Sequence, residues 1–218
     1  MTRTTNARLA GFMFLFYIAS GIAGMMLFNP TRGIDGTAAK LAAIAQHAAL
    51  VRGAAVFALI AMMNAFILAV ALYALTRDYD RDIALLALVC RVAEGVMAAV
   101  GAVAKRALLA AAIAAPTSPA AAALGDVLLK NQGLTTLIGA TAFAIGSTLY
   151  CYLFLRARSI PLWMAWLGVL ASALLVIALP IELAGGPATG YVWAPMAVFE
   201  VVFALWLIAR AGTVRPAE

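Results

Sequence analysis

Three ionisable residues lie inside stretches of sequence that are otherwise apolar. Arg91 and Glu94 are three residues apart in "CRVAEGVMAAV", and Glu200 lies in "AVFEVVFALWL". A charged side chain at the centre of a membrane helix costs about 2.5–3.5 kcal/mol on insertion scales, so such residues usually have a function or a partner. These two segments are therefore the first places to look for chemistry.

The spacing of the three residues indicates which chemistry is available. Residues i and i+3 share a helix face, so Arg91 and Glu94 are expected to face the same neighbours. With Glu200, the three side chains sum to a net charge of −1 when all are ionised, and a buried uncompensated anion is costly. Either a second cation reaches them, for which Arg52 and Lys105 are the candidates, or one glutamate keeps its proton near neutral pH and serves as a general acid.

Other apolar segments bring polar and aromatic side chains to a similar depth. Aromatic residues available to line a pocket beside the acids are Tyr17, Phe143, Trp193, Phe199 and Phe203. We predict that Glu94 and Glu200 are the catalytic groups of this site. The predicted ligand-binding residues are Arg91, Asn64, Arg52, Trp193, Phe203 and Tyr17.

The elements that must position these residues are membrane-spanning helices. The chain has 218 residues, of which 66% are hydrophobic and 11% charged, and this composition is typical of integral membrane proteins. Apolar runs longer than eighteen residues predict spanning helices. We predict an all-α, polytopic bundle of six transmembrane helices in a single domain, with spans at about 9–28, 53–75, 83–104, 134–155, 161–183 and 191–208.

Two longer connections, at about 29–52 and 105–133, also carry a helical pattern. The Ala-rich stretch "TAAKLAAIAQHAALVRG" predicts a helix that leads into the second span. The stretch after Lys105 predicts an extension of the third span, a proline-bounded turn at 116–119 and a short amphipathic helix.

Small residues flank Arg91 and Glu94 on one face of the third span, and bulky residues occupy the other face. The first face holds Ala84, Ala87, Ala98, Gly101 and Lys105. The second holds Leu85, Leu86, Val89, Met97, Val100 and Val103. Because small residues mark helix contacts in membranes, we predict that the charged face points into the bundle. The motif "GATAFAIG" (139–146) is likewise expected at a close helix contact.

Basic residues near the span ends predict the orientation. Eight lie on the side of the two termini and six on the other side, so the bias favours a cytoplasmic N-terminus and a cytoplasmic C-terminus. The net charge of +6 reflects this distribution, and we expect no nucleic-acid partner. Cys90 and Cys151 lack the spacing of a metal site, and the sequence predicts neither a metal nor a cofactor.

Four segments, in order along nearly the whole chain, resemble a family of bacterial membrane proteins catalogued as domain of unknown function 4386. They are "ARLAGFMFLFYIASGI", "LVRGAAVFALI", "CRVAEGVMAAVGA" and "FEVVFALWLIARAG". The resemblance implies a six-helix protein of the bacterial cytoplasmic (inner) membrane and draws attention to Arg52, Arg91, Glu94 and Glu200. It implies no reaction. The Ala-rich connection at 105–133 departs from the family pattern.

Three functions fit these observations. The first is a site for a small hydrophobic or amphiphilic molecule, such as a membrane lipid, where a glutamate acts as general acid in an isomerase or cyclase reaction. The second is a proton-coupled transporter. Six helices are a small number for a transporter, so this function would favour a homo-oligomer. The third is a non-catalytic scaffold or subunit, in which the Arg91–Glu94 pair fixes helix packing.

Overall fold

The computed structural model describes residues 2–28, 31–187 and 190–213, and these fold into helices. The α-helices are α1 (Arg3–Leu27), α2 (Thr37–Gln46), α3 (Ala48–Thr76), α4 (Arg81–Ala114), α5 (Pro119–Lys130), α6 (Leu134–Arg156), α7 (Leu162–Leu183) and α8 (Trp193–Ala209). Six segments, containing α1, α3, α4, α6, α7 and α8, are long and apolar enough to cross a membrane. The predicted all-α bundle of six transmembrane helices is confirmed.

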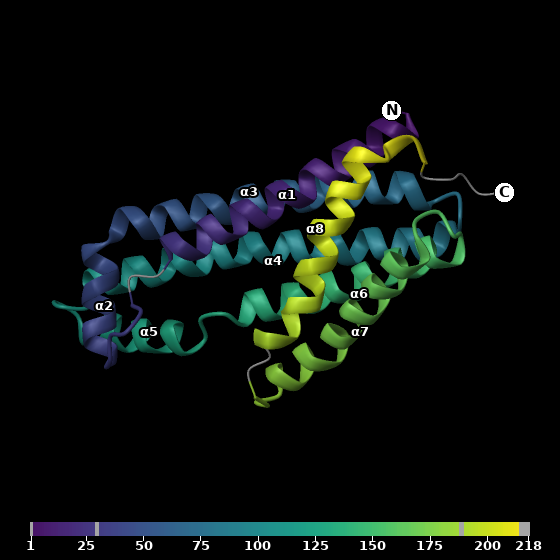
Figure 1. The fold of residues 1–218 in the computed structure, drawn as a ribbon. Coiled ribbons are helices and arrows are strands. Elements are labelled where there is room, and N and C mark those ends of the chain that lie inside the picture. Colours follow the sequence, from purple (N-terminus) through teal and green to yellow (C-terminus); the bar gives the residue numbers. More distant parts are fainter. Residues whose placement is uncertain (1, 29–30, 188–189, 214–218) are drawn as a thin grey trace.

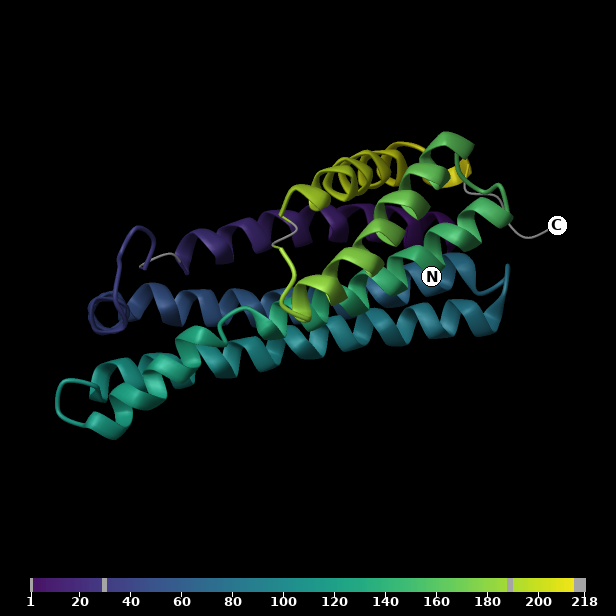
Figure 2. The same ribbon diagram turned by 90° about the horizontal axis from the view of Figure 1, so that it is seen from below.

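The six long helices form a ring in which each packs against the next. The order around the ring is α1, α3, α4, α6, α7 and α8, and α8 returns to α1. Figures 1 and 2 show α1, α3 and α4 running alongside one another, while α8 crosses α1 obliquely. As a result α1 and α8 meet near the chain termini and diverge towards the opposite end of the bundle.

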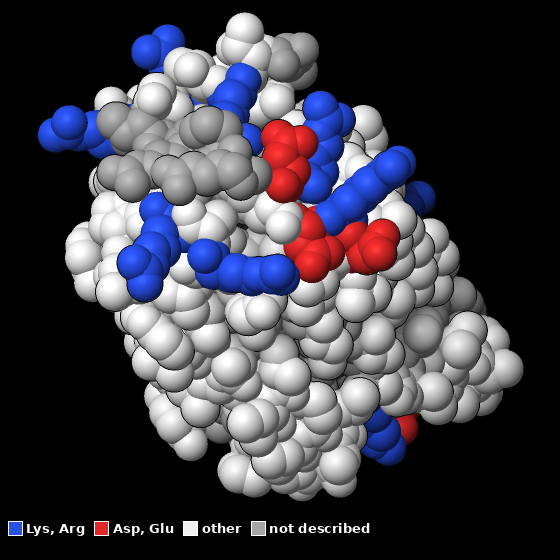
Figure 3. All heavy atoms as spheres, turned by 90° about the vertical axis from the view of Figure 1, so that its right-hand side faces the viewer, with Lys and Arg blue, Asp and Glu red and all other residues white. Residues whose placement is uncertain are grey.

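The surface of the ring fits a hydrocarbon environment. On α4 the exposed side chains include Leu85, Val89, Val100 and Val103, the last being 70% exposed. Charged side chains gather instead at the end that holds the termini, as Figure 3 shows. There the Arg156 guanidinium lies 3.2 Å from a carboxylate oxygen of Asp80. This separation of charged end and apolar flank is typical of a polytopic membrane protein.

The opposite end of the bundle carries a cap built from the predicted long connections. At about 1.5 Å per residue α4 is about 50 Å long, which exceeds the hydrocarbon thickness of about 30 Å. Its last turns extend into the cap and pack against α2, α3 and α5. The buried cap residues are Leu41, Ile44, Val51, Leu108, Leu109 and Ala112. The extension of the third span, the turn and the short α5 helix follow the prediction.

The prediction for the first long connection is wrong in one respect, because its helix does not run straight into the second span. The chain turns at His47, where the helical dihedral angles are interrupted. The His47 ring nitrogen Nδ1 lies 2.8 Å from the Ala43 carbonyl oxygen, at the end of α2. The turn lets Leu41 and Ile44 of α2 cover the end of α4, so a tertiary contact overrides a locally continuous helical pattern.

The contact that closes the ring depends on a glycine of α1. A Cβ atom on residue 11 would lie 2.7 Å from the Ala204 carbonyl oxygen and 2.7 Å from Ile208 Cγ1, both on α8. The Phe14 and Phe203 rings meet edge to face beside it, with centroids 5.7 Å apart. Gly11 therefore sets the distance between α1 and α8.

We predict that Gly11→Ala destabilises the protein, because the added methyl group meets backbone atoms of α8. Overpacking of this kind costs about 1–3 kcal/mol. The matched control is Gly21→Ala on the same helix, where a Cβ meets nothing within 4 Å. Thermal unfolding in detergent should show a lower midpoint for Gly11→Ala only. An equal midpoint for the two variants would contradict the close α1–α8 contact.

Candidate functional site

The two charged residues of α4 form an ion pair inside the bundle. Arg91 Nη1 lies 2.8 Å from Glu94 Oε2, and the two side chains are 1% and 7% exposed. The predicted shared face is therefore confirmed, and it points inward. Since an isolated charge in hydrocarbon is costly, each residue supplies the counter-charge that the other needs.

Aromatic residues of α1 and α6 enclose this ion pair. The Tyr17 hydroxyl group donates a hydrogen bond to Glu94 Oε1. The Arg91 guanidinium lies 4.7 Å from the centre of the Phe143 ring and 5.8 Å from that of Tyr17. Cation–π contacts of this kind stabilise a desolvated cation. Thus three helices hold one pair of charges.

Two glycines of α6 let that helix approach the pair closely. A Cβ on residue 139 would lie 3.0 Å from Met97 Cβ, and one on residue 146 would lie 3.3 Å from Arg91 Cγ. These glycines are the two ends of the "GATAFAIG" motif, and the predicted close contact is confirmed. The contact buries Arg91 behind α6.

Glu200 of α8 differs from Glu94 in that, among the described residues, it forms no ion pair with an arginine or lysine. Its side chain is 8% exposed, and among the described residues its buried Oε1 atom has no hydrogen-bond partner. Glu200 nevertheless lines a cavity that Glu94 and Tyr17 also line. An unpartnered carboxyl group that is more than nine-tenths buried, at the wall of a cavity, is a group available to a ligand.

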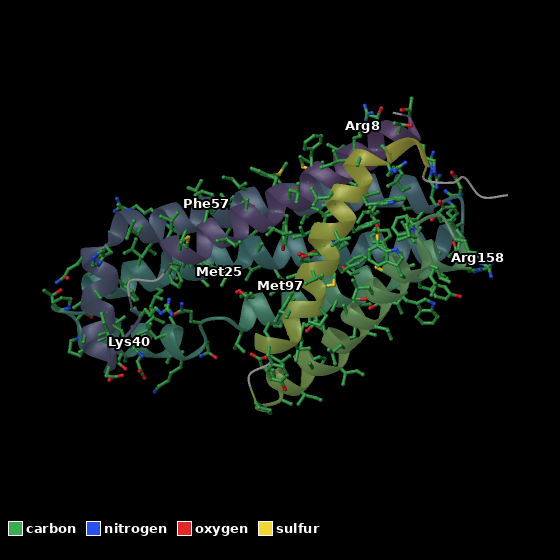
Figure 4. All side chains as sticks on the ribbon, viewed as in Figure 1. Arg8, Met25, Lys40, Phe57, Met97 and Arg158 are labelled. Atoms are coloured by element: carbon green, nitrogen blue, oxygen red, sulfur yellow. The ribbon has the colours of Figure 1, made fainter. Side chains whose placement is uncertain are left out.

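The cavity has a volume of about 1060 Å³ and lies between α1, α3, α4, α6 and α8. It is large enough for a small organic ligand. Its apolar walls include Met25, Phe28, Phe57, Met97, Phe143 and Trp193. Figure 4 labels Met25, Phe57 and Met97, which come from three different helices. The Phe143 and Trp193 rings stack with centroids 6.0 Å apart and so tie α6 to the start of α8.

The cavity is elongated along one face of α4. Residues of this helix that line it are Glu94, Met97, Ala98, Gly101, Ala104, Lys105 and Leu108. At about 1.5 Å per residue this stretch spans about 20 Å. The acidic residues Glu94 and Glu200 lie towards the bundle centre, and Lys105 lies towards the cap. The cavity thus has an acidic inner end and a basic outer end.

Several predicted site residues lie on this cavity, and others lie elsewhere. Tyr17, Glu94, Trp193 and Glu200 line it. Arg91 is 1% exposed and lies behind the wall, paired with Glu94.

The remaining predicted residues lie away from the cavity wall. Asn64 Nδ2 donates a hydrogen bond to the Met13 carbonyl oxygen at 3.0 Å, which joins α3 to α1. The Phe203 ring stacks on Phe199 at 5.2 Å in the core. Arg52 is exposed at the start of α3. Asn64 lies twelve residues further along this helix, so Arg52 is separated from it by about 18 Å.

Sequence reasoning misplaced one residue of the cavity wall and missed another. The sequence predicts Met97 on the outer face of α4, but the residue lines the cavity, next to Gly139 of α6. Lys105 was predicted on the inner face, and it does line the cavity. Arg32, between α1 and α2, also lines it, and no spacing in the sequence signals this.

Comparison with known proteins identifies the family of the chain, and this family has no assigned activity. The family described as a domain of unknown function (DUF4386) matches residues 9–211. No curated protein and no solved structure matches the chain.

We predict that Arg91→Met destabilises the protein by about 3–5 kcal/mol, because it leaves Glu94 buried without a counter-charge. The double variant Arg91→Met/Glu94→Met should regain most of this loss, since two apolar side chains of similar size replace the pair. Unfolding by denaturant in detergent micelles measures both free energies.

The matched control is Arg156→Met, which breaks an ion pair whose arginine is 56% exposed. Exposed pairs contribute about 0–1 kcal/mol. A loss for Arg91→Met no larger than this control would show that the buried pair does not hold the bundle together.

Proposed function

The chain belongs to the DUF4386 family, and from that premise we propose that it binds a small hydrophobic or amphiphilic molecule within the membrane. Glu94 and Glu200 form the polar inner end of the binding site. The observation that carries the proposal is the carboxyl group of Glu200, which is 8% exposed and faces a cavity of about 1060 Å³.

The apolar walls support a ligand of low polarity. Met25, Phe28, Phe57 and Met97 provide flexible and aromatic surface along the length of the cavity. Since the surroundings of the bundle are hydrocarbon, such a ligand reaches the cavity without crossing water. The divergence of α1 and α8 leaves their contact confined to the end near the termini, where Phe14 meets Phe203.

The two glutamates differ in their surroundings, and this difference suggests separate chemical roles. Glu94 is paired with Arg91 and accepts a hydrogen bond from Tyr17, so we assign it the carboxylate form. Glu200 forms no ion pair among the described residues, and its buried Oε1 atom has no hydrogen-bond partner there, so we assign it the acid form. Paired carboxyl groups in unlike environments act as acid and base.

An isomerase reaction would use both groups. Glu200 would give its proton to one carbon of a double bond, and Glu94 would take a proton from a neighbouring carbon, so that the double bond moves. The substrate neither gains nor loses atoms. Proton exchange between the two carboxyl groups and solvent then restores the starting state, and neither a metal nor a redox cofactor takes part.

Arg91 acts in this proposal as a positioning residue. Its guanidinium is enclosed by Phe143, Tyr17 and Glu94 and fixes the orientation of the Glu94 carboxylate. The same contacts also fit a purely structural role for the Arg91–Glu94 pair, whereas the unpartnered carboxyl group of Glu200 at the cavity favours a ligand.

A transporter would use the same two acids. It would differ from an enzyme in moving the ligand across the membrane.

We predict that Ala98→Trp lowers the amount of bound ligand at least about tenfold, because the indole obstructs the middle of the cavity. The matched control is Val96→Trp, whose side chain points outward on the same helix and is 47% exposed in the native protein. Native mass spectrometry of the detergent-purified protein should detect one defined molecule, distinct from the bulk lipid mixture, on the wild type and on Val96→Trp. Equal occupancy in Ala98→Trp, or bulk phospholipid alone, contradicts the binding site.

Proton transfer by Glu200 can be measured separately from ligand binding. Incubation in D₂O should introduce deuterium into the bound molecule, because the acid exchanges its proton with solvent. Glu200→Gln keeps the shape of the side chain and should abolish the labelling while the molecule stays bound. Labelling that persists in Glu200→Gln excludes Glu200 as the acid.

We further propose that the protein resides in the bacterial cytoplasmic membrane with both termini in the cytoplasm. The excess of basic residues at the end with the termini supports this orientation. Figure 4 labels Arg158 at that end and Lys40 in the cap at the other end.

We predict that a membrane-impermeant maleimide added to intact cells labels Lys40→Cys but not Arg158→Cys. Both variants are made after Cys90 and Cys151 have been replaced by alanine. Permeabilised cells, in which both sites should react, provide the control. The opposite labelling pattern would place the cap in the cytoplasm and reverse the orientation.

A further inference from the structure

The outer end of the cavity carries positive charge that the acid–base proposal does not use. Lys105 of α4 and Arg32, between α1 and α2, both line this end. We propose that it binds the anionic headgroup of an amphiphile whose apolar chain extends along the cavity to Glu94 and Glu200. This inference rests on the proposed function and adds the class and the direction of the ligand.

Lys105 is held in a position suited to an anion. Its side chain is half-buried, and its Nζ atom lies 5.3 Å from the centre of the Phe28 ring. A Cβ on residue 101 would lie 3.7 Å from Lys105 Nζ, so the side chain folds back by about one turn into the cavity. In the ion pairs of the described residues Lys105 has no carboxylate partner. A partly desolvated ammonium group of this kind is stabilised when an anion binds.

The start of α6 faces the same point. The same Cβ on residue 101 would lie 3.1 Å from Thr135 Oγ1, so the threonine hydroxyl and the ammonium group share one pocket. The N-cap residue Gly133 has a φ angle of 100°, and no side chain of the described residues caps this helix. Thr135 and Thr136, in its first turn, line the cavity. The Leu134 N–H group bonds the Asn131 carbonyl oxygen, and the helix dipole of this 23-residue helix favours an anion beside its first turn.

The depth of this end matches that of a lipid headgroup. Lys105 lies fourteen residues after Arg91 on α4, which is about 21 Å along the helix. With Arg91 near the middle of a hydrocarbon layer about 30 Å thick, Lys105 lies beyond the edge of that layer. A charged group bound at Lys105 therefore stays in the polar interface, while the rest of the ligand lies in hydrocarbon.

The stretch between the two ends accepts an alkyl or isoprenoid chain. Glu94 and Lys105 are separated by eleven residues, about 16 Å, and the wall between them includes Phe57, Met97 and Ala98. The unpartnered carboxyl group of Glu200 at the far end is an independent sign that the cavity receives a ligand. An inorganic anion would occupy only the outer end, whereas an amphiphile contacts both ends and the wall between them.

The test compares probes that differ only in one part. Delipidated wild-type protein is titrated in detergent with hexadecyl phosphate, with hexadecanol and with inorganic phosphate, and native mass spectrometry measures the bound fraction. Lys105→Gln removes the cation and keeps a polar, unbranched-stem side chain that is one atom shorter. The matched control is Arg106→Gln, which changes the neighbouring exposed residue outside the cavity wall. Thermal unfolding shows whether each variant retains the fold.

We expect hexadecyl phosphate to bind the wild type about tenfold more tightly than hexadecanol, because a charge-assisted contact is added. Lys105→Gln should lower the affinity for hexadecyl phosphate to that for hexadecanol and leave hexadecanol binding unchanged. Arg106→Gln should change neither affinity.

Four results overturn the proposal. Equal binding of the two alkyl probes, or a loss of both in folded Lys105→Gln, shows that Lys105 does not select a headgroup, and the proposed function then still stands. Inorganic phosphate that binds alone with the same dependence on Lys105 indicates a site for a free anion. Failure of both alkyl probes to bind the wild type removes the proposed function together with this inference.

Discussion

The pairing of Arg91 with Glu94 in hydrocarbon is the constraint around which the bundle is arranged. Neither charge is stable there without the other, and the pair still leaves guanidinium N–H groups and a second carboxylate oxygen to be accommodated. Tyr17 donates to that oxygen, and Phe143 covers the cation. Helices α1, α4 and α6 must therefore meet at one depth. Gly139 and Gly146 permit this meeting, because they let the α6 backbone approach α4.

The same arrangement accounts for the cavity. Helix α1 is held to α8 by Gly11 and Phe14 near the termini and to α4 by Tyr17 at mid-depth. Beyond Tyr17, α1 and α8 diverge, and the small residues of α4 that face this space, Ala98 and Gly101, leave it unfilled. The bundle is thus packed near the termini and hollow towards the cap, and the Arg91–Glu94 ion pair lies at the boundary between the two regions.

The cavity joins groups of opposite charge that come from different helices. Glu94 and Glu200 lie at its inner end, and Lys105 and Arg32 lie at its outer end. Such polarity suits a ligand with a headgroup and a chain better than a compact ion or a purely apolar molecule. The positive charge of Arg91 affects the ligand site only indirectly, because Arg91 is paired with Glu94 and does not line the cavity.

The six spans, the helical extension of α4 and the inward face with Arg91 and Glu94 could be predicted from the amino-acid sequence, because they follow from hydropathy, helix periodicity and the cost of burying charge. The sequence also placed a close contact at 139–146. The turn of α2 at His47, the position of Asn64 and Phe203 away from the cavity, and the position of Met97 and Arg32 on its wall emerged from the three-dimensional arrangement alone. These features depend on which helices meet and at what angle. Contacts between residues far apart in the chain set that geometry, and the local pattern does not encode it.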